Sequence, residues 1–344
     1  MTGARDTRPL AGRVVVRSEY GLPYSKGLMA QSIMATGLSP ERSFALAAQV
    51  EQRLAERAEG EIDVDRLREL AEEVLRHEEG EQVLTRFRRW WKVPDLDRPL
   101  LVLIGGVTGV GKSTIATQLA VRLGITRVIA TDQLRQVVRA FFSQDFMPAV
   151  HHSSFDVGKT LSGLPDDAAG TVAGFLRQAH DLAPGIDALV QRAVSEGTAL
   201  VLEGVHLLPG IPEWSLRKQA IDVQVLLTVR DEQAHKAHFH MRGAQTPRSP
   251  ERYLEAFDRI RILQDYLIER AEGAKIPIID EEGLEPALNR VMDAVLEAVG
   301  RAEEGGTADA PPAPAGARSG RGAAGPVAGA AAKVQSPSSR EARQ

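Results

Sequence analysis

The strongest chemical signal in the sequence is GVTGVGKST at residues 106–114. It fits the pattern G-x-x-x-x-G-K-[ST], directly follows the apolar run 100–105 and directly precedes a helical pattern that starts at Ile115. Glycines let such a loop curl so that its N–H groups face phosphate oxygens, while Lys112 bridges the β- and γ-phosphates and the Ser113 hydroxyl ligates Mg²⁺. The loop therefore predicts ATP and Mg²⁺ as ligands. Its predicted nucleotide contacts are Gly106, Val107, Thr108, Gly109, Val110, Gly111, Lys112, Ser113 and Thr114.

A carboxylate stands at the end of another apolar run. Residues 200–204 read LVLEG, so a strand predicted over 199–203 ends at Glu203. At that place a carboxylate can hold the water shell of a magnesium ion opposite Ser113. The alternative is an incidental polar cap, but a carboxylate on a buried strand needs a partner. Ser113 and Glu203 are therefore the predicted metal-binding pair.

The segment TDQLRQVVR at 131–139 carries candidates for binding a second substrate. Asp132 is predicted to orient the acceptor hydroxyl or take its proton, and N-capping of the following helix is the alternative. Arg135 and Arg139 are four residues apart and therefore share a helix face. Paired guanidiniums suit an anionic small-molecule acceptor such as a carboxylate or a phosphate, whereas a solvated basic face is the alternative. In the loop HHSS, Ser153 and Ser154 are predicted to line the same pocket.

A basic segment follows the apolar run 223–229. Kinases need cations over the transferring phosphoryl group, often from a mobile lid. Arg242 and Arg248 are the predicted catalytic cations of such a lid, together with Lys112 and Asp132 in the body of the domain. Pro247 and Pro250 interrupt the segment, as a lid requires. A solvated basic helix surface is the alternative.

Three histidines in the same segment, His235, His238 and His240, suggest a metal site at first sight. On a helix, positions i and i+3 share a face while i+5 does not, so a three-ligand site is awkward. No metal is therefore predicted there.

Strands alternating with helices predict an α/β fold with a parallel five-stranded sheet of the P-loop NTPase type, flanked by helices. Because each apolar run is continuous, the strands should be covered on both faces. The predicted strands are 100–105, 125–130, 199–203, 223–229 and 276–279, and the predicted helices are 113–123, 132–142, 170–197 and 250–272. The helix over 170–197 should break or kink near Pro184.

Composition divides the rest of the chain. A short β-branched run at 13–17 and three amphipathic helical patterns predict a small, mostly α-helical domain over 13–92. Its second helix should start with Pro40 after an N-cap at Ser39. Residues 303–344 are rich in Ala, Gly, Pro and Ser and are predicted to be a disordered tail. The remaining predicted parts are an arm over 1–12, a linker over 93–99 and a P-loop kinase domain over 100–302.

Net charge and residue usage narrow the partner classes. A net charge of −4 gives no reason to expect nucleic-acid binding through bulk charge. Cysteine is absent, which excludes disulfides and thiolate metal sites and fits a reducing cytosol. The longest apolar run, 100–104, is too short to span a bilayer, and the N-terminus has no signal-peptide pattern. We expect a cytoplasmic protein without membrane partners; its oligomeric state stays open, a homo-oligomer included.

Residues 13–91 resemble an ATP-cone, a small regulatory nucleotide-binding domain. The matching features are VVVRSEYGLPYSKGLMAQSI, the helix start SPERSFALAAQVEQRL and the helix over 62–76. The resemblance implies that Arg17 and Lys26 contact a regulatory ATP or dATP.

Residues 100–280 resemble the 2-phosphoglycerate kinase family. The resemblance rests on IGGVTGVGKST, TDQLRQVVR, HHSSF, LEGVHLLPG, HFHMR and RYLEAFDRIRILQDYLIERA taken together, and an ATP-cone before this core is characteristic of the family. It implies that ATP phosphorylates the 3-hydroxyl of 2-phosphoglycerate to give 2,3-bisphosphoglycerate. Asp280-Glu281-Glu282 stands where the family often has an asparagine near the adenine.

Two further functions remain open at this point. One is a kinase of another anionic acceptor on the same fold, such as an inositol phosphate or a sugar acid, because fold does not fix the acceptor. The other is an ATP-sensing regulatory NTPase, although a pure sensor has no need of Arg135 and Arg139.

Overall fold

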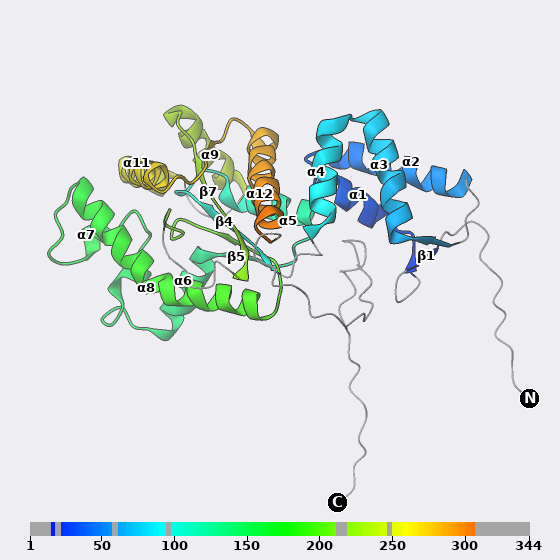
Figure 1. Cartoon of the computed structure of the whole chain (residues 1–344). Coiled ribbons are helices and arrows are strands. Elements are labelled where there is room, and N and C mark those ends of the chain that lie inside the picture. The colour runs from blue at the N-terminus through cyan, green and yellow to red at the C-terminus, as the bar shows by residue number, and fades with distance from the viewer. Residues whose placement is uncertain are drawn as a thin grey trace, which may run out of the picture. The chain divides into compact units, whose positions relative to one another are not determined.

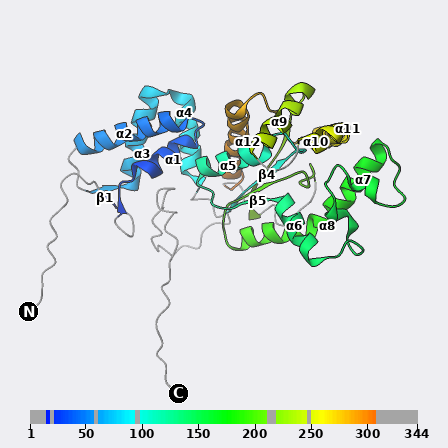
Figure 2. The same ribbon diagram turned by 180° about the vertical axis from the view of Figure 1, so that it is seen from behind.

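The computed structural model describes residues 15–17, 22–56, 61–93, 98–210, 219–245 and 250–306. The chain divides into two compact units, one containing the residues up to Asp95 and one that starts at Leu96 (Figures 1 and 2). Among the helices in the described ranges, none has the length and apolarity that crossing a bilayer requires. The predicted arm and most of the predicted tail lie outside the described residues, and the last helix continues to Gly306, inside the segment predicted to be disordered.

The N-terminal unit is mostly helical, as predicted. Its three short strands form a sheet in which β1 is antiparallel to β2 and parallel to β3. The elements are β1 (Val15–Arg17), β2 (Leu22–Pro23), α1 (Lys26–Met34), α2 (Pro40–Glu56), β3 (Glu61–Asp63), α3 (Val64–Glu78) and α4 (Glu81–Trp91).

Local signals set the starts of two of these helices. The N–H of Arg42 donates to Ser39 Oγ at 3.3 Å and Pro40 is the first residue of α2, so the predicted N-cap and first-turn proline are both present. Asp63 accepts from the N–H of Arg66 at the start of α3. One apolar stripe of α3 is buried in the core of this unit: Leu67, Leu70, Ala71, Val74 and Leu75.

The second unit is built on five parallel strands in the order β5-β6-β4-β7-β8, which confirms the predicted sheet. Continuous apolar runs form its central strands because both faces are covered. The strands are β4 (Leu100–Gly105), β5 (Val128–Ala130), β6 (Leu200–Glu203), β7 (Ile221–Thr228) and β8 (Ile278–Asp280).

Helices cover both faces of this sheet. In Figures 1 and 2, α9 and α12 lie on one side and α6 and α8 on the other. The helices are α5 (Lys112–Leu123), α6 (Thr131–Phe141), α7 (Val157–Thr160), α8 (Ala168–Ser195), α9 (Glu232–Gln245), α10 (Glu251–Glu255), α11 (Phe257–Gly273) and α12 (Leu284–Gly306), with a 3₁₀ turn, η2 (Pro148–His151).

Of the break or kink predicted near Pro184, the break is absent, because α8 is one continuous helix with Pro184 inside it. Proline removes one backbone hydrogen bond and costs about 3 kcal/mol in a helix interior. Leu182 and Ile186, on either side of it, are buried in the same core, which also contains sheet residues such as Leu103 and Leu202. Each such side chain contributes about 1.5–3 kcal/mol on burial, so packing on both sides outweighs the local defect.

The helix predicted over 250–272 is in turn divided. It consists of α10 and α11, which meet at Ala256. Phe257, the first residue of α11, is buried. The predicted helical segment is therefore correct in extent but not in continuity.

The carboxyl ends of the strands meet at one edge of the sheet. The chain leaves β4 towards β5 on one side, while β7 lies on the other side of β4. In parallel α/β sheets this reversal opens a crevice beyond the strand ends, where ligands bind. The loops after β4, β5, β6 and β7 all start at this edge.

Candidate active site

The loop between β4 and α5 is held in a conformation that glycine permits. Gly106 and Gly109 have φ of 142° and 92°. A Cβ at Gly106 would lie 2.5 Å from the carbonyl oxygen of Leu227, and one at Gly109 would lie 2.6 Å from the ring of Phe239. The loop is thus packed against β7 on one side and against α9 on the other.

Two polar side chains of this loop are already engaged. Lys112 Nζ donates to the carbonyl oxygen of Val107 at 2.6 Å, and Ser113 Oγ donates to Glu203 Oε1 at 2.7 Å. Glu203 is buried at the carboxyl end of β6, beside Ile104 of β4. Hydroxyl and carboxylate oxygens are the donor set that Mg²⁺ prefers, so Ser113 and Glu203 fit that ion.

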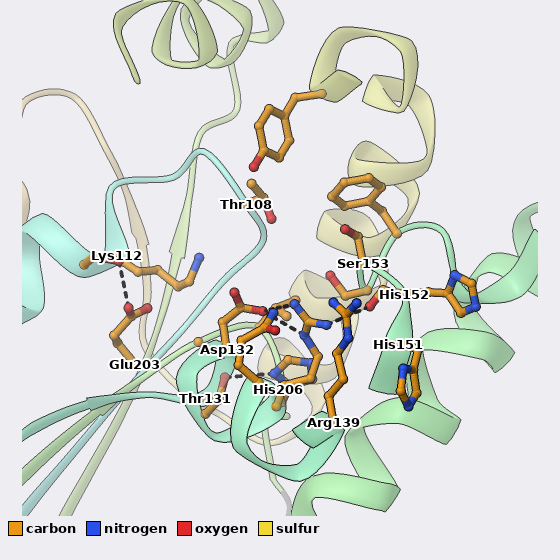
Figure 3. Close-up of a pocket in the computed structure, with 18 of the residues that line it drawn as sticks. Thr108, Lys112, Thr131, Asp132, Arg139, His151, His152, Ser153, Glu203 and His206 are labelled. Carbon is orange, nitrogen blue, oxygen red and sulfur yellow. Dashed lines mark hydrogen bonds and ion pairs between the residues drawn. The ribbon is translucent and has the colours of Figure 1, made fainter. Parts of the chain in front are cut away.

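A cavity of about 380 Å³, here called the Asp132 cavity, continues from this pair. In Figure 3, Lys112 and Glu203 lie at one side of it and Arg139, His152 and Ser153 at the other. Its walls are Thr108, Lys112, Ser113, Thr131, Asp132, Arg135, Gln136, Arg139, His151, His152, Ser153, Ser154, Phe155, Glu203, Gly204, Val205, His206, Arg252 and Tyr253.

Asp132 lies in the first turn of α6, whose N-cap is Ala130. The N-capping role considered for Asp132 is therefore wrong. Its carboxylate Oδ1 lies 2.9 Å from Arg135 Nε, and the Asp132 side chain is 53% exposed. A half-exposed carboxylate on the wall of a cavity can reach a ligand.

Arg135 is buried and most of its donors are used within the protein. Besides Asp132, its Nη1 donates to the carbonyl oxygens of Val150 and His152, at 2.9 and 3.2 Å. The guanidinium thus ties α6 to η2 and to His152, the residue that follows it. Arg139, one turn further along α6, is exposed and lines the same cavity.

A buried chain of hydrogen bonds forms the floor of the cavity. Gln178 of α8 donates from Nε2 to the carbonyl oxygens of Ala149 and His152, at 2.6 and 3.0 Å. Its Oε1 lies 2.9 Å from His206 Nε2, and His206 Nδ1 lies 2.8 Å from Thr131 Oγ1. Burial lowers the pKa of His206 to about 3, so its ring is neutral at physiological pH.

Further contacts hold the serine loop and the start of α10. Arg252 Nη2 donates to Ser153 Oγ at 2.9 Å and lies 3.3 Å from Asp156 Oδ2. Arg259 Nη2 donates to the other oxygen of Asp156 at 2.8 Å. Ser154, also predicted to line the pocket, is a buried wall residue.

Basic side chains outnumber carboxylates in the Asp132 cavity. Burial lowers the pKa of His152, which keeps that ring neutral. The charged wall residues are Lys112, Arg135, Arg139 and Arg252 against Asp132 and Glu203. The balance favours an anionic ligand.

A second cavity, also of about 380 Å³, is lined by the loop and by residues of α9 and α12. Met241 and Leu284 give it an apolar surface, and both side chains are partly exposed to solvent. His238 and Glu281 stand at its edge, 3.2 Å apart. This Met241 cavity shares Lys112 and Ser113 with the Asp132 cavity, so the two cavities adjoin at these residues.

The structure brings together most of the predicted site and leaves part of it aside. Arg248 lies outside the described residues, as do the side chains of Arg242 and Arg17. Lys26 Nζ lies 3.2 Å from Glu51 Oε2 on the surface of the N-terminal unit. Residues that the sequence analysis did not assign include Thr131, Gln136, Gln178, His206, Arg252 and Tyr253.

Proteins similar to this chain in sequence carry the name 2-phosphoglycerate kinase. The chain is 33% identical over 286 residues to the 2-phosphoglycerate kinase of Methanopyrus kandleri. The aligned region covers 82% of this chain and 87% of that protein. It is 32% identical over 286 residues to the 2-phosphoglycerate kinase of Pyrococcus horikoshii, with 83% and 94% covered. The chain belongs to the 2-phosphoglycerate kinase family. The resemblance predicted from the motifs is thereby confirmed.

Other comparisons add little to the 2-phosphoglycerate kinase assignment. No protein-family model matches the chain. A gluconokinase from Sinorhizobium meliloti covers 62% of the chain at 17% identity and a TM-score of 0.33, which is too weak a likeness to bear on activity. The family relation therefore rests on the sequence relatives, which match over most of their length.

Proposed function

We propose that this protein transfers the γ-phosphoryl group of ATP to the 3-hydroxyl of 2-phosphoglycerate, giving 2,3-bisphosphoglycerate and ADP. The observation that carries the proposal is that Lys112, Asp132 and Arg139 line one cavity. A phosphate-binding lysine, a carboxylate and an anion-binding guanidinium are what such a transfer requires. The names of the relatives support 2-phosphoglycerate over the other acceptors considered.

The donor is assigned to the loop side of the site. Its phosphates would lie against the N–H groups of residues 106–114, with the β- and γ-phosphates near Lys112 Nζ. Lys112 would leave the Val107 carbonyl oxygen to do so. Ser113 and Glu203 would hold Mg²⁺, which supplies positive charge to the phosphates when bound. The adenine of ATP would lie in the Met241 cavity, against Met241 and Leu284.

The acceptor is assigned to the other end of the Asp132 cavity. Its phosphate and carboxylate would bind Arg139, Arg252 and the hydroxyls of Ser153 and Ser154, with Arg135 holding the wall behind them. Ion pairs with guanidinium groups are charge-assisted and directional, so they fix which hydroxyl faces the donor.

Asp132 is assigned to the acceptor hydroxyl. Its carboxylate would accept the hydroxyl hydrogen bond and receive the proton as the oxygen attacks phosphorus and the bond to ADP breaks. Arg242 and Arg248 remain proposed cations of a closing lid, which would neutralise charge on the transferred group.

Regulation by a second nucleotide at the N-terminal unit is part of the proposal. Arg17 and Lys26 are its proposed contacts. We expect the Lys26→Ala variant to show a changed rate response to added dATP at fixed ATP. An unaltered dATP response would remove Lys26 from the regulatory site. The cytoplasmic location and the lack of nucleic-acid and membrane partners remain predictions from composition.

The activity is tested by ADP formation from Mg-ATP with and without 2-phosphoglycerate, with 2,3-bisphosphoglycerate measured in parallel. We expect ADP release to depend on 2-phosphoglycerate, with one bisphosphoglycerate formed per ADP. 3-Phosphoglycerate, which carries the same groups in exchanged positions, is the matched control. Equal rates with both acids, or none with either, would overturn the assignment of the acceptor.

A further inference from the structure

Two histidines of α9 bind the main chain of the phosphate loop. His235 Nε2 lies 2.9 Å from the carbonyl oxygen of Thr108, and His238 Nδ1 lies 2.9 Å from the carbonyl oxygen of Gly109. Together with Lys112 Nζ on the Val107 carbonyl oxygen, side-chain nitrogens hold three consecutive carbonyl groups of the loop.

The geometry of the peptide bond gives these contacts a consequence. A trans peptide unit is planar, and its C=O and N–H point in opposite directions. A nitrogen that holds the Thr108 carbonyl oxygen therefore fixes the direction of the Gly109 N–H. By the same rule, His238 fixes the direction of the Val110 N–H.

We propose that His235 and His238 are positioning residues for nucleotide phosphate: by holding the two carbonyl groups outward, they keep the N–H groups of Gly109 and Val110 directed at the phosphate. The proposal rests on the nucleotide site proposed above and adds to it the residues that orient its main chain. Neither histidine touches the transferred group.

The surroundings of His235 suit a permanent donor. Its ring is fully buried, stacked 5.2 Å from the ring of Phe239 and edge-on 5.4 Å from that of Phe257. Burial lowers its pKa to about 4, so the ring is neutral at physiological pH. Within the described part of the chain its Nδ1 is buried without a hydrogen-bond partner. With Nε2 donating to the Thr108 carbonyl oxygen, the neutral ring makes its single N–H bond to the loop.

His238 connects the loop to the strand edge on the other side. Its Nδ1 faces the carbonyl oxygen of Gly109, and its Nε2 lies 3.2 Å from Glu281 Oε2. Carbonyl and carboxylate oxygens only accept hydrogen bonds, so the contact with the loop requires a proton on Nδ1. The imidazole, and not Glu281, is therefore the group to remove in a test.

Close packing supports a fixed spacing between helix and loop. A Cβ at Gly109 would lie 2.8 Å from His235 Nε2 and 2.6 Å from the Phe239 ring. The loop therefore lies directly against α9. A substitution that shortens or lengthens the side chain at 235 or 238 would shift the main chain of the loop.

The test uses amide side chains that copy one ring nitrogen. Glutamine places its amide nitrogen near the position of histidine Nε2, and asparagine near that of Nδ1. His235→Gln and His238→Asn should therefore keep the loop contacts, whereas His235→Leu and His238→Leu remove them. The dissociation constant of ADP, measured by calorimetry on the full chain, is the main readout; the acceptor KM and the melting temperature are measured beside it.

We expect each leucine variant to bind ADP about tenfold more weakly, the value of one hydrogen bond, with the acceptor KM unchanged. The amide variants should recover most of that affinity. Leucine variants that bind ADP as the parent does, or amide variants as weak as the leucine ones, would overturn the proposal. Because His238 is partly exposed, its variants give the answer even if those at His235 fail to fold. A parent protein that binds no ADP would instead overturn the proposed nucleotide site itself.

Discussion

The two ends of the Asp132 cavity differ in how their polar groups are held. At the donor end, Lys112 and Ser113 each make a contact that a ligand can replace, one with a carbonyl oxygen and one with Glu203. At the acceptor end, Gln178 and His206 are buried and bonded to the protein on both sides. The first arrangement exchanges partners when substrate arrives, and the second supports a pocket that is already formed. Substitutions at the donor end should therefore reduce turnover alone, and those behind the acceptor end should also reduce stability.

The largest effect is expected for Lys112→Ala. Removing a cation that stabilises the transferring phosphoryl group should lower kcat by at least about 10²–10³-fold. The free energy of unfolding should hardly change, because Lys112 makes an exchangeable contact. The measurements are ADP release and urea unfolding, with the exposed Lys159→Ala as control. A large loss of stability in Lys112→Ala would contradict the difference between the two ends.

Asp132→Asn comes next. Loss of the proton acceptor should lower kcat by about 10²-fold, within the usual range for general base catalysis. The affinity for ATP should stay the same, since the proposed mechanism assigns Asp132 to the acceptor hydroxyl and not to ATP. Asp166→Asn, at an exposed site, is the control. A variant as active as the parent would show that Asp132 handles no proton.

Gln178→Leu tests the support behind the pocket. It would leave the carbonyl oxygen of Ala149 and His206 Nε2 without their partner, and it would remove one of two side-chain donors to the His152 carbonyl oxygen. Each buried group left unsatisfied costs about 1–3 kcal/mol. We expect a lower free energy of unfolding and an acceptor KM raised about tenfold with the ATP KM unchanged. The exposed Gln52→Leu serves as control. An equal rise in both KM values would show that the two ends are not independent.

The smallest predicted effect is a pH dependence of stability. Burial lowers the pKa of His206 to about 3 and that of His235 to about 4. The unfolded chain therefore binds more protons below pH 6.5, and stability is complete above that pH and falls as the pH decreases towards 4. Between pH 7.5 and 5.5 each histidine should cost about 1.4 kcal/mol of unfolding free energy. Urea unfolding at the two pH values checks this, and His206→Asn should reduce the difference by its own share. If the difference in unfolding free energy between the two pH values were the same in His206→Asn as in the parent, His206 would not be a source of the pH dependence.

The donor end was predictable from the sequence because it is local. Glycine spacing, the preceding apolar strand and the following helix are contiguous over residues 100–123, and the sheet followed from continuous apolar runs. The acceptor end was predictable only in part. Asp132 and Arg139 belong to a readable helix face, but Gln178 comes from the middle of α8 and looks like any polar helix residue. Its role depends on tertiary contacts with η2 and the segment after β6.

Local preference and packing disagree at two places in the second unit. Proline lowers helix propensity within its own turn, yet Leu182 and Ile186 bury apolar surface on both sides of Pro184 and keep α8 in one piece. Arg135 was assigned to the substrate from its spacing to Arg139, but burial commits most of its donors to carbonyl oxygens of the protein. The four-residue spacing identified the helix face that the two arginines share. It could not show that Arg135, and not Arg139, would hydrogen-bond to main-chain carbonyl oxygens of the protein.

The amide of Gln178 also determines which atom donates in each hydrogen bond of the buried chain behind the cavity. Both of its carbonyl partners require the nitrogen side, so its oxygen must accept, and His206 must give its Nε2 proton to that oxygen. Nδ1 then accepts from the Thr131 hydroxyl. In each of these hydrogen bonds the donor lies on the Thr131 side. The chain of bonds ends at main-chain carbonyl oxygens, which carry no proton to release. In the proposed transfer, a proton leaving the acceptor hydroxyl would therefore not pass along these hydrogen bonds and would leave by way of Asp132, whose side chain is 53% exposed.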